Sequence, residues 1–322
     1  MNYKRGFVSI ACCALLQTFA FTSCSDISII NQIEHDCNAN GGNGNPSDST
    51  SKRKVEVGFY GNVNLLTTKA GTTPLQKDRN VNVYTWYQQG EYITTTNYFT
   101  NVAGVLSVSR NVPLSLFPGT YEFYAFGIGN KATTLPSVDI SSGFMNDLEN
   151  GVDYLTAELT NQVISGSTTL DLTLNHACTQ LLVDIYPGSS TTKIDSVQSA
   201  AVQAPVTTGD FLSIFTGRIV PVSTFQDSLF AMNVVNNSCN QILLPIKNTA
   251  SLKFNFSVYV NSELTARNYT VQIPLVNSTM LAGSSYHYRV NVAEESVTIM
   301  DASVNNWVDV DETGNPLTPT PN

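Results

Sequence analysis

The sequence is poor in charged residues and rich in small polar ones. Charged side chains make up 13% of the 322 residues, against about a quarter in ordinary globular domains. The formal net charge is -9, and no basic patch offsets it. Because such a surface repels phosphate backbones, we expect no nucleic-acid partner.

Cysteines are too few and too scattered to hold the fold together. Three of the six lie in or directly after an N-terminal apolar run. The remaining three, Cys37, Cys178 and Cys239, are an odd number without C-x-x-C spacing. This pattern excludes a disulfide framework and a zinc site. A single bridge between Cys178 and Cys239 stays an open alternative.

Motifs for catalysis are also missing. The three histidines, His35, His176 and His287, are far apart in the sequence. There is no G-x-S-x-G, no H-E-x-x-H, and no glycine-rich loop between a strand and a helix. We therefore expect no enzyme, no cofactor and no metal, with His176 and His287 in partly buried hydrogen-bonding roles.

The N-terminus has the features of an export signal. Lys4 and Arg5 precede a mostly apolar stretch, 7–21, that is too short for a confident membrane span. Residues 1–23 are thus a predicted signal peptide. Small residues followed by Cys24 resemble the lipobox of bacterial lipoproteins, so lipid on the Cys24 sulfur is expected. The alternative is an ordinary signal with a chance cysteine.

A flexible leader, 24–54, is expected next. Residues 38–51 carry no large apolar side chain and should not order. Before them, DISIINQI at 26–33 has four isoleucines and is interpreted as a short strand that pairs elsewhere, or as an extension of the signal. The run Lys52-Arg53-Lys54 is either a protease site, with Arg53 as the cut residue, or a solvated junction.

The body of the chain shows period-two alternation. In SLKFNFSVYV, 251–260, apolar residues recur at every second position, the pattern of a strand with one buried face. Many such segments separated by Gly, Pro, Asn and Ser turns predict an all-β protein of antiparallel sandwiches with few or no helices. Short helices are expected only at 143–150 and 222–230.

Two segments of similar pattern indicate two domains. Residues 118–124 and 282–288 both place a glycine turn before a strand with alternating aromatics. We expect β-sandwich domains at 55–168 and 169–310, and a disordered tail at 311–322. A cluster of aromatics within the first domain, Tyr84, Trp86, Tyr87 and Tyr92, is either a sugar-stacking surface or part of a core strand and hairpin.

The order of several weak motifs resembles the fimbrillins and fimbrillin-like proteins of Bacteroides-type bacteria. Four segments carry the resemblance: 117–127 with its glycine turn, 169–185 with His176-Ala177, 281–292 with alternating tyrosines, and 297–311 with Trp307. The resemblance implies two transthyretin-like β-sandwiches in a pilus subunit or surface adhesin.

The same resemblance implies a life cycle and partners. Such subunits travel as lipoproteins to the outer membrane, where an arginine-specific protease cuts the leader of stalk and tip members. A strand from a neighbouring subunit then fills the opened groove, whereas anchor members stay uncut and keep the lipid. Applied here, Arg53 is the cut site and 26–33 the removed strand. Partners are other subunits or a ligand on a host or bacterial surface. The alternative is a lipid-anchored, carbohydrate-binding surface protein.

Overall fold

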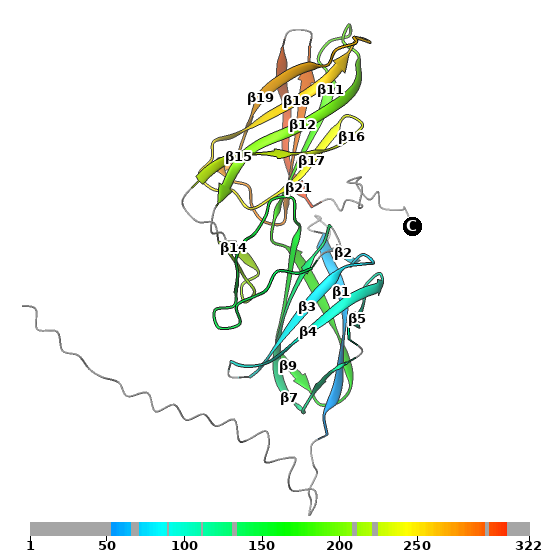
Figure 1. Cartoon of the computed structure of the whole chain (residues 1–322), viewed down its shortest axis with the longest axis vertical. Coiled ribbons are helices and arrows are strands. Elements are labelled where there is room, and N and C mark those ends of the chain that lie inside the picture. Colours follow the sequence, from blue (N-terminus) through cyan, green and yellow to red (C-terminus); the bar gives the residue numbers. More distant parts are fainter. Residues whose placement is uncertain are drawn as a thin grey trace, which may run out of the picture. The chain divides into compact units, whose positions relative to one another are not determined.

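Almost every described element is a strand (Figure 1). The computed structural model describes residues 53–65, 71–88, 90–110, 112–130, 134–207, 211–220, 225–293 and 296–307. The predictions for the signal, Cys24, the 26–33 segment and the C-terminal tail lie outside these residues. Among the described residues the single helical element is a 3-10 turn, Val276–Ser278, and no helix is long and apolar enough to cross a membrane. The all-β prediction is confirmed, while its transthyretin-like detail stays a prediction.

The first sandwich is a single nine-stranded sheet that closes on itself. Its strand order is β10-β9-β7-β3-β4-β5-β1-β2, with β6 also on β1. A parallel pairing between β1, the second-to-last strand of this path, and β10, the first, closes the sheet from Val57↔Thr168 to Val63↔Leu174. The strands are β1 Val55–Leu65, β2 Gly71–Pro74, β3 Asn80–Tyr87, β4 Glu91–Val102, β5 Val105–Val108, β6 Leu114–Leu116, β7 Gly119–Ile128, β9 Tyr154–Ile164 and β10 Thr168–His176.

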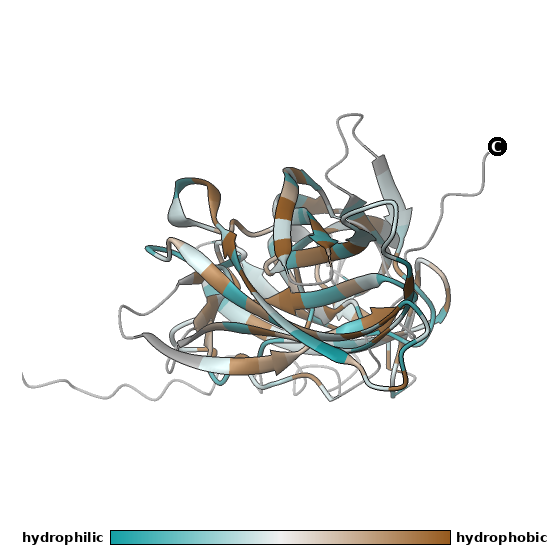
Figure 2. Cartoon of the chain, turned by 90° about the horizontal axis from the view of Figure 1, so that it is seen from above, coloured by the Kyte–Doolittle hydropathy of each residue, from teal (hydrophilic) through white to brown (hydrophobic). Residues whose placement is uncertain are grey.

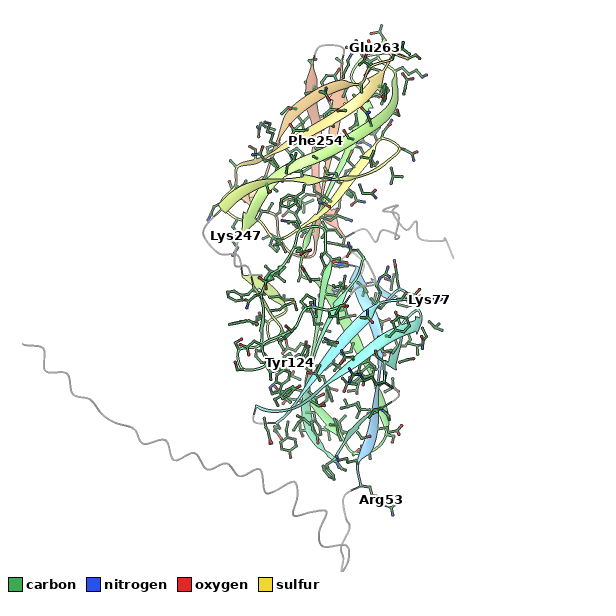
Figure 3. All side chains as sticks on the ribbon, viewed as in Figure 1. Arg53, Lys77, Tyr124, Lys247, Phe254 and Glu263 are labelled. Atoms are coloured by element: carbon green, nitrogen blue, oxygen red, sulfur yellow. The ribbon has the colours of Figure 1, made fainter. Side chains whose placement is uncertain are left out.

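The second sandwich has two sheets, ordered β16-β17-β11-β20-β21 and β15-β12-β18-β19. Alternation predicted the buried face of β18: Leu252, Phe254, Phe256, Val258 and Val260 are at most 3% exposed. Figure 2 shows such apolar and polar bands along the strands. Figure 3 labels Phe254 on this sandwich. The strands are β11 Thr179–Pro187, β12 Ile194–Thr207, β15 Phe225–Ala231, β16 Asn233–Val235, β17 Ser238–Leu243, β18 Ser251–Val260, β19 Arg267–Pro274, β20 Ser284–Val292 and β21 Val297–Asn306.

A third, small sheet covers part of the first sandwich. It consists of β8 Phe144–Met145, β13 Phe211–Ser213 and β14 Arg218–Val220. Met145 and Leu212 from this sheet join the same core cluster as Phe126 of β7. A segment from the later half of the chain therefore buries a face of the first sheet.

Both short helices predicted from the sequence are wrong. Residues 143–150 form β8 and turns instead, because Gly143 and Asp147 adopt positive φ angles of 69° and 60°, which no α-helix contains. Over 222–230, the described part is β15. It pairs with β12 from Thr207↔Phe225 to Ala201↔Ala231, so ladder hydrogen bonds override a weak local helix preference.

The two similar segments form β7 and β20, one in each sandwich. In the first, the Tyr121 hydroxyl donates to the Phe117 carbonyl at 2.8 Å. In the second, the Tyr286 hydroxyl accepts from the Leu281 N–H at 2.9 Å. Each tyrosine thus ties the turn before its strand to the strand itself.

The predicted boundary at 168/169 lies at the β9–β10 hairpin of the first sheet. β10 pairs with both β1 and β9, and the next strand, β11, is the first to enter a sheet of the second sandwich. The domain limits themselves stay a prediction.

Candidate functional site

The described chain begins with the candidate cleavage residue. Arg53 is exposed and precedes β1 without secondary structure, and Figure 3 shows it at the beginning of that strand. The neighbouring Lys54 ammonium lies 5.2 Å from the centre of the Phe117 ring. Arg53 is therefore accessible on a segment with no described strand partner, which is the conformation that a protease needs. The cut itself stays a prediction.

β1 is paired along both of its edges. One edge forms the parallel ladder with β10. The other edge meets β6, β5 and β2 in turn, all antiparallel. Phe59 on β1 is 3% exposed and contacts the Tyr98 and Phe123 rings edge-on. The strand that follows Arg53 is thus a full member of the first sheet and of its core.

The four aromatic residues proposed for sugar contact do not form one surface. Tyr84 and Trp86 are 3% and 5% exposed, whereas Tyr87 and Tyr92 are 38% and 36% exposed. Neighbouring residues of a strand point to opposite faces, so Tyr87 packs against Tyr121 while Trp86 packs against Tyr124. Tyr92 pairs with Trp86 across the strands and packs on its ring at 5.4 Å, so the two exposed tyrosines lie on opposite faces. The sugar hypothesis stays a prediction, with ring area for a glycan on Tyr87 or on Tyr92 but not on one surface shared by all four residues.

Sequence reasoning missed a fifth aromatic residue in this cluster, Phe215. Its ring lies 5.2 Å from Trp86 and 5.1 Å from Tyr124, both edge-on. Burial raises the pKa of Tyr124 to about 12, with the Glu122 carboxylate as a further cause. A side chain on Gly143 would lie 2.0 Å from the Phe215 ring, so glycine is required there. Phe215 lies in the turn after β13, so no strand pattern in the sequence marked it.

His176 forms a buried polar pair at the end of β10. Its Nδ1 lies 2.8 Å from the Asp153 Oδ1, and the two side chains are 2% and 5% exposed. Trp307 stacks on the imidazole, with ring centres 4.0 Å apart and planes inclined by 15°. The Nε2 atom has no hydrogen-bond partner among the described residues. This arrangement orients the ring for packing.

His287 forms a second carboxylate pair on the second sandwich. Its Nε2 lies 2.8 Å from the Asp184 Oδ2, and the Ser238 hydroxyl donates to the other oxygen of Asp184. Burial acts to raise the pKa of Asp184, but the hydrogen bonds from His287 and Ser238 outweigh it and leave that pKa lowered. Because the serine donates to the carboxylate and not to the imidazole, the geometry lacks the serine–histidine bond of a hydrolase.

The two described cysteines are separate buried thiols. Cys178 and Cys239 are both free, and the Cys178 thiol donates to the Val152 carbonyl at 3.2 Å. Burial raises the pKa of both thiols, that of Cys239 to about 12. The bridge between them, left open by the sequence, does not form. Across the described residues, no three His, Cys, Asp or Glu side chains gather closely enough to hold a metal ion.

Solved structures share this arrangement of sandwiches. A candidate cell adhesion protein from Bacteroides uniformis is 12% identical, covers 79% of this chain and 98% of its own, and has a TM-score of 0.61. One from Bacteroides ovatus is 16% identical, with coverages of 80% and 99% and a TM-score of 0.61. One from Bacteroides fragilis is 15% identical, with coverages of 80% and 99% and a TM-score of 0.55. At these identities the likeness shows the fold.

Family membership follows from a comparison at the level of the sequence. No curated protein matches it, but the profile of the fimbrillin-like family matches residues 68–307. The matched region begins just after β1 and runs through both sandwiches to Trp307. The chain therefore belongs to the fimbrillin-like family.

Proposed function

We propose that this chain is a subunit of a surface pilus, or a related cell-surface adhesin, that is exported as a lipoprotein through Cys24. The observation that carries the proposal is the fimbrillin-like match across both sandwiches. Its partners are other pilus subunits or a ligand on a host or bacterial surface. Its place is the outer membrane and the fimbria, reached by way of the lipid.

In this proposal the leader decides whether the protein stays on the membrane. Lipid on Cys24 anchors the precursor, since each buried methylene contributes about 0.8 kcal/mol. Arg53 is exposed and lies between that anchor and β1. Cleavage after Arg53 releases the body from its lipid, and a subunit that escapes cleavage remains an anchor.

Strand exchange requires a further step, because cleavage after Arg53 leaves β1 in place. β1 satisfies ladder groups of β10 on one side and of β5 and β6 on the other. A slot for a donated strand opens only when β1 itself leaves the sheet. Such a slot would expose unpaired backbone groups and apolar surface, which a strand from another subunit can cover. We place that event after a cut in 66–70, between β1 and β2, where Lys69 is the basic residue, so this cut needs a lysine-cleaving protease and not the arginine-specific one.

Mass spectrometry of the N-terminus of the surface protein tests these steps. A diacylated Cys24 supports an anchor or adhesin, a start at Lys54 supports release without strand exchange, and a start within 66–71 supports a polymerising subunit. Arg53→Ala should abolish the Lys54 start, whereas Arg110→Ala, at another exposed arginine, should not. An unmodified Ser25 start would overturn the lipoprotein proposal. Recovery of the protein only as a soluble periplasmic monomer would overturn the surface role.

A further inference from the structure

The last described strand, β21, has few buried side chains toward its C-terminal end. It lies at the edge of its sheet and pairs with β20 from Ser284↔Asn306 to Val292↔Val297. None of its described side chains is buried, and Met300 is 65% exposed. The next residue, Trp307, is by contrast 4% exposed. Val297 and Ile299, at the start of the strand, are half-buried and pack against the core of the second sandwich. From Met300 to Trp307, the buried apolar contact of the described side chains is therefore concentrated in Trp307.

Trp307 docks on a platform that the first sandwich builds. The platform is the His176 ring, held by Asp153 through the 2.8 Å hydrogen bond. Asp153 is fixed in turn by two main-chain bonds: its carbonyl accepts from the Gly129 N–H at 2.9 Å, and its N–H donates to the Asn130 side chain at 3.0 Å. A side chain on Gly129 would lie 2.2 Å from the Asp153 Oδ2.

These contacts join three strand ends of the first sheet in the platform. Gly129 follows β7, Asp153 precedes β9, and His176 ends β10. The platform is thus fixed by bonds that do not involve Trp307 itself. The polar atoms of this platform are shielded from solvent, and hydrogen bonds in such surroundings hold the orientation of the His176 ring tightly.

We propose that Trp307 is a latch that fastens the end of β21 to the first sandwich. With the indole seated on His176, β21 stays paired with β20 along its length. When the indole leaves, β21 frays from its Asn306 end and exposes the ladder edge of β20, while both sandwiches stay folded. An exposed edge of this kind is a site for pairing with another strand. The inference does not depend on the proposed pilus role.

Hydrogen–deuterium exchange of the full chain tests the latch. In Trp307→Ala, amides of 299–306 and their partners in β20 should exchange about tenfold faster or more, with β12 and β18 unchanged, because local opening is separate from global unfolding. His176→Ala should act in the same direction. Met300→Ala, an exposed change on the same strand, should have no effect, and Trp307→Phe should retain most of the protection.

Two outcomes would overturn the proposal. Unchanged exchange of β21 in Trp307→Ala would show that β20 pairing alone holds the strand. An equal rise in β3, β12, β18 and β21 would show that Trp307 merely packs the whole molecule.

A fluorescence measurement covers the case in which Trp307→Ala does not fold. The chain has two tryptophans, so Trp86→Phe leaves Trp307 as the sole reporter. At urea concentrations below the main unfolding transition, where far-UV circular dichroism is still unchanged, acrylamide should quench the Trp307 fluorescence more strongly than it does without urea. Quenching that rises only with that transition would contradict a latch.

Discussion

Replacing Phe59 by alanine should destabilise the first sandwich more than any substitution at an exposed position of β1. The ring is 3% exposed and meets Tyr98 at 5.4 Å and Phe123 at 5.3 Å, inclined by 80° and 71°. Deleting a buried phenyl group costs about 3–5 kcal/mol. Within this, each edge-on aromatic pair contributes about 0.5–1.5 kcal/mol. A loss near 4 kcal/mol is therefore expected, mostly from burial and the remainder from the two ring contacts.

Thermal and urea unfolding of the purified chain measure this loss. At about 2–4 °C per kcal/mol, the transition of the first sandwich should fall by roughly 8–16 °C. The two sandwiches need not unfold together. The transition of the first sandwich is therefore followed by near-UV circular dichroism, which reports the packing of its aromatic residues. Phe59→Leu should lose much less, because it keeps most of the buried volume. Glu56→Ala, an exposed position of the same strand, should stay within about 0.5 kcal/mol.

A loss below about 1 kcal/mol in Phe59→Ala would refute this reasoning. It would mean that β1 contributes little to the core and that the strand is loosely attached before any cut. The proposed requirement for a cut beyond Leu65 would then lose its physical basis.

Three further outcomes are expected. The lowered pKa of Asp184 stabilises the fold above the unfolded pKa, near 3.9, and this contribution is lost as pH falls through the folded value. In Asp184→Asn, the urea midpoint should therefore depend less on pH between pH 6 and pH 2. Cys178 and Cys239, whose pKa values burial raises, should resist iodoacetamide at pH 8 in the folded chain and react in urea, as peptide mapping would show; labelling of either in the native protein would contradict their burial. If the Tyr92 ring binds glycans, Tyr92→Ala should weaken binding on an array with a much smaller stability loss than Trp86→Ala, which should cost about 3–5 kcal/mol. Binding that survives loss of both Tyr87 and Tyr92 would exclude the sugar hypothesis for these residues.

Local patterning was sufficient to predict most of the strands. In β18 every second residue is buried, because a pleated strand turns successive side chains to opposite faces. The same rule explains why Trp86 and Tyr87, adjacent in the sequence, differ so widely in exposure. The sequence grouped the four aromatics by proximity, whereas the strand separates them by face.

Local sequence patterns did not predict the contacts between distant segments. Nothing in VEVGF indicates that β1 runs parallel to β10 and closes the sheet. Nor does local sequence show that Phe215 packs on Trp86, or that Trp307 meets His176. In each case the partner lies in another part of the chain, and many apolar segments would satisfy the same pattern equally well.

The closed first sheet changes how the leader must be understood. From the sequence, one cut at Arg53 serves both to release the lipid and to open a groove. In our proposal these roles are separate, because Arg53 precedes β1 and β1 is paired on both edges. In our proposal, a cut before β1 releases the lipid and leaves β1 paired, whereas a cut after β1 removes a strand with a buried phenylalanine and a full parallel ladder. Since the second cut costs the first sandwich much of its stability, it is useful only where another strand is ready to replace β1. A subunit with an intact β1 should therefore persist alone, and one without it should persist only in a complex.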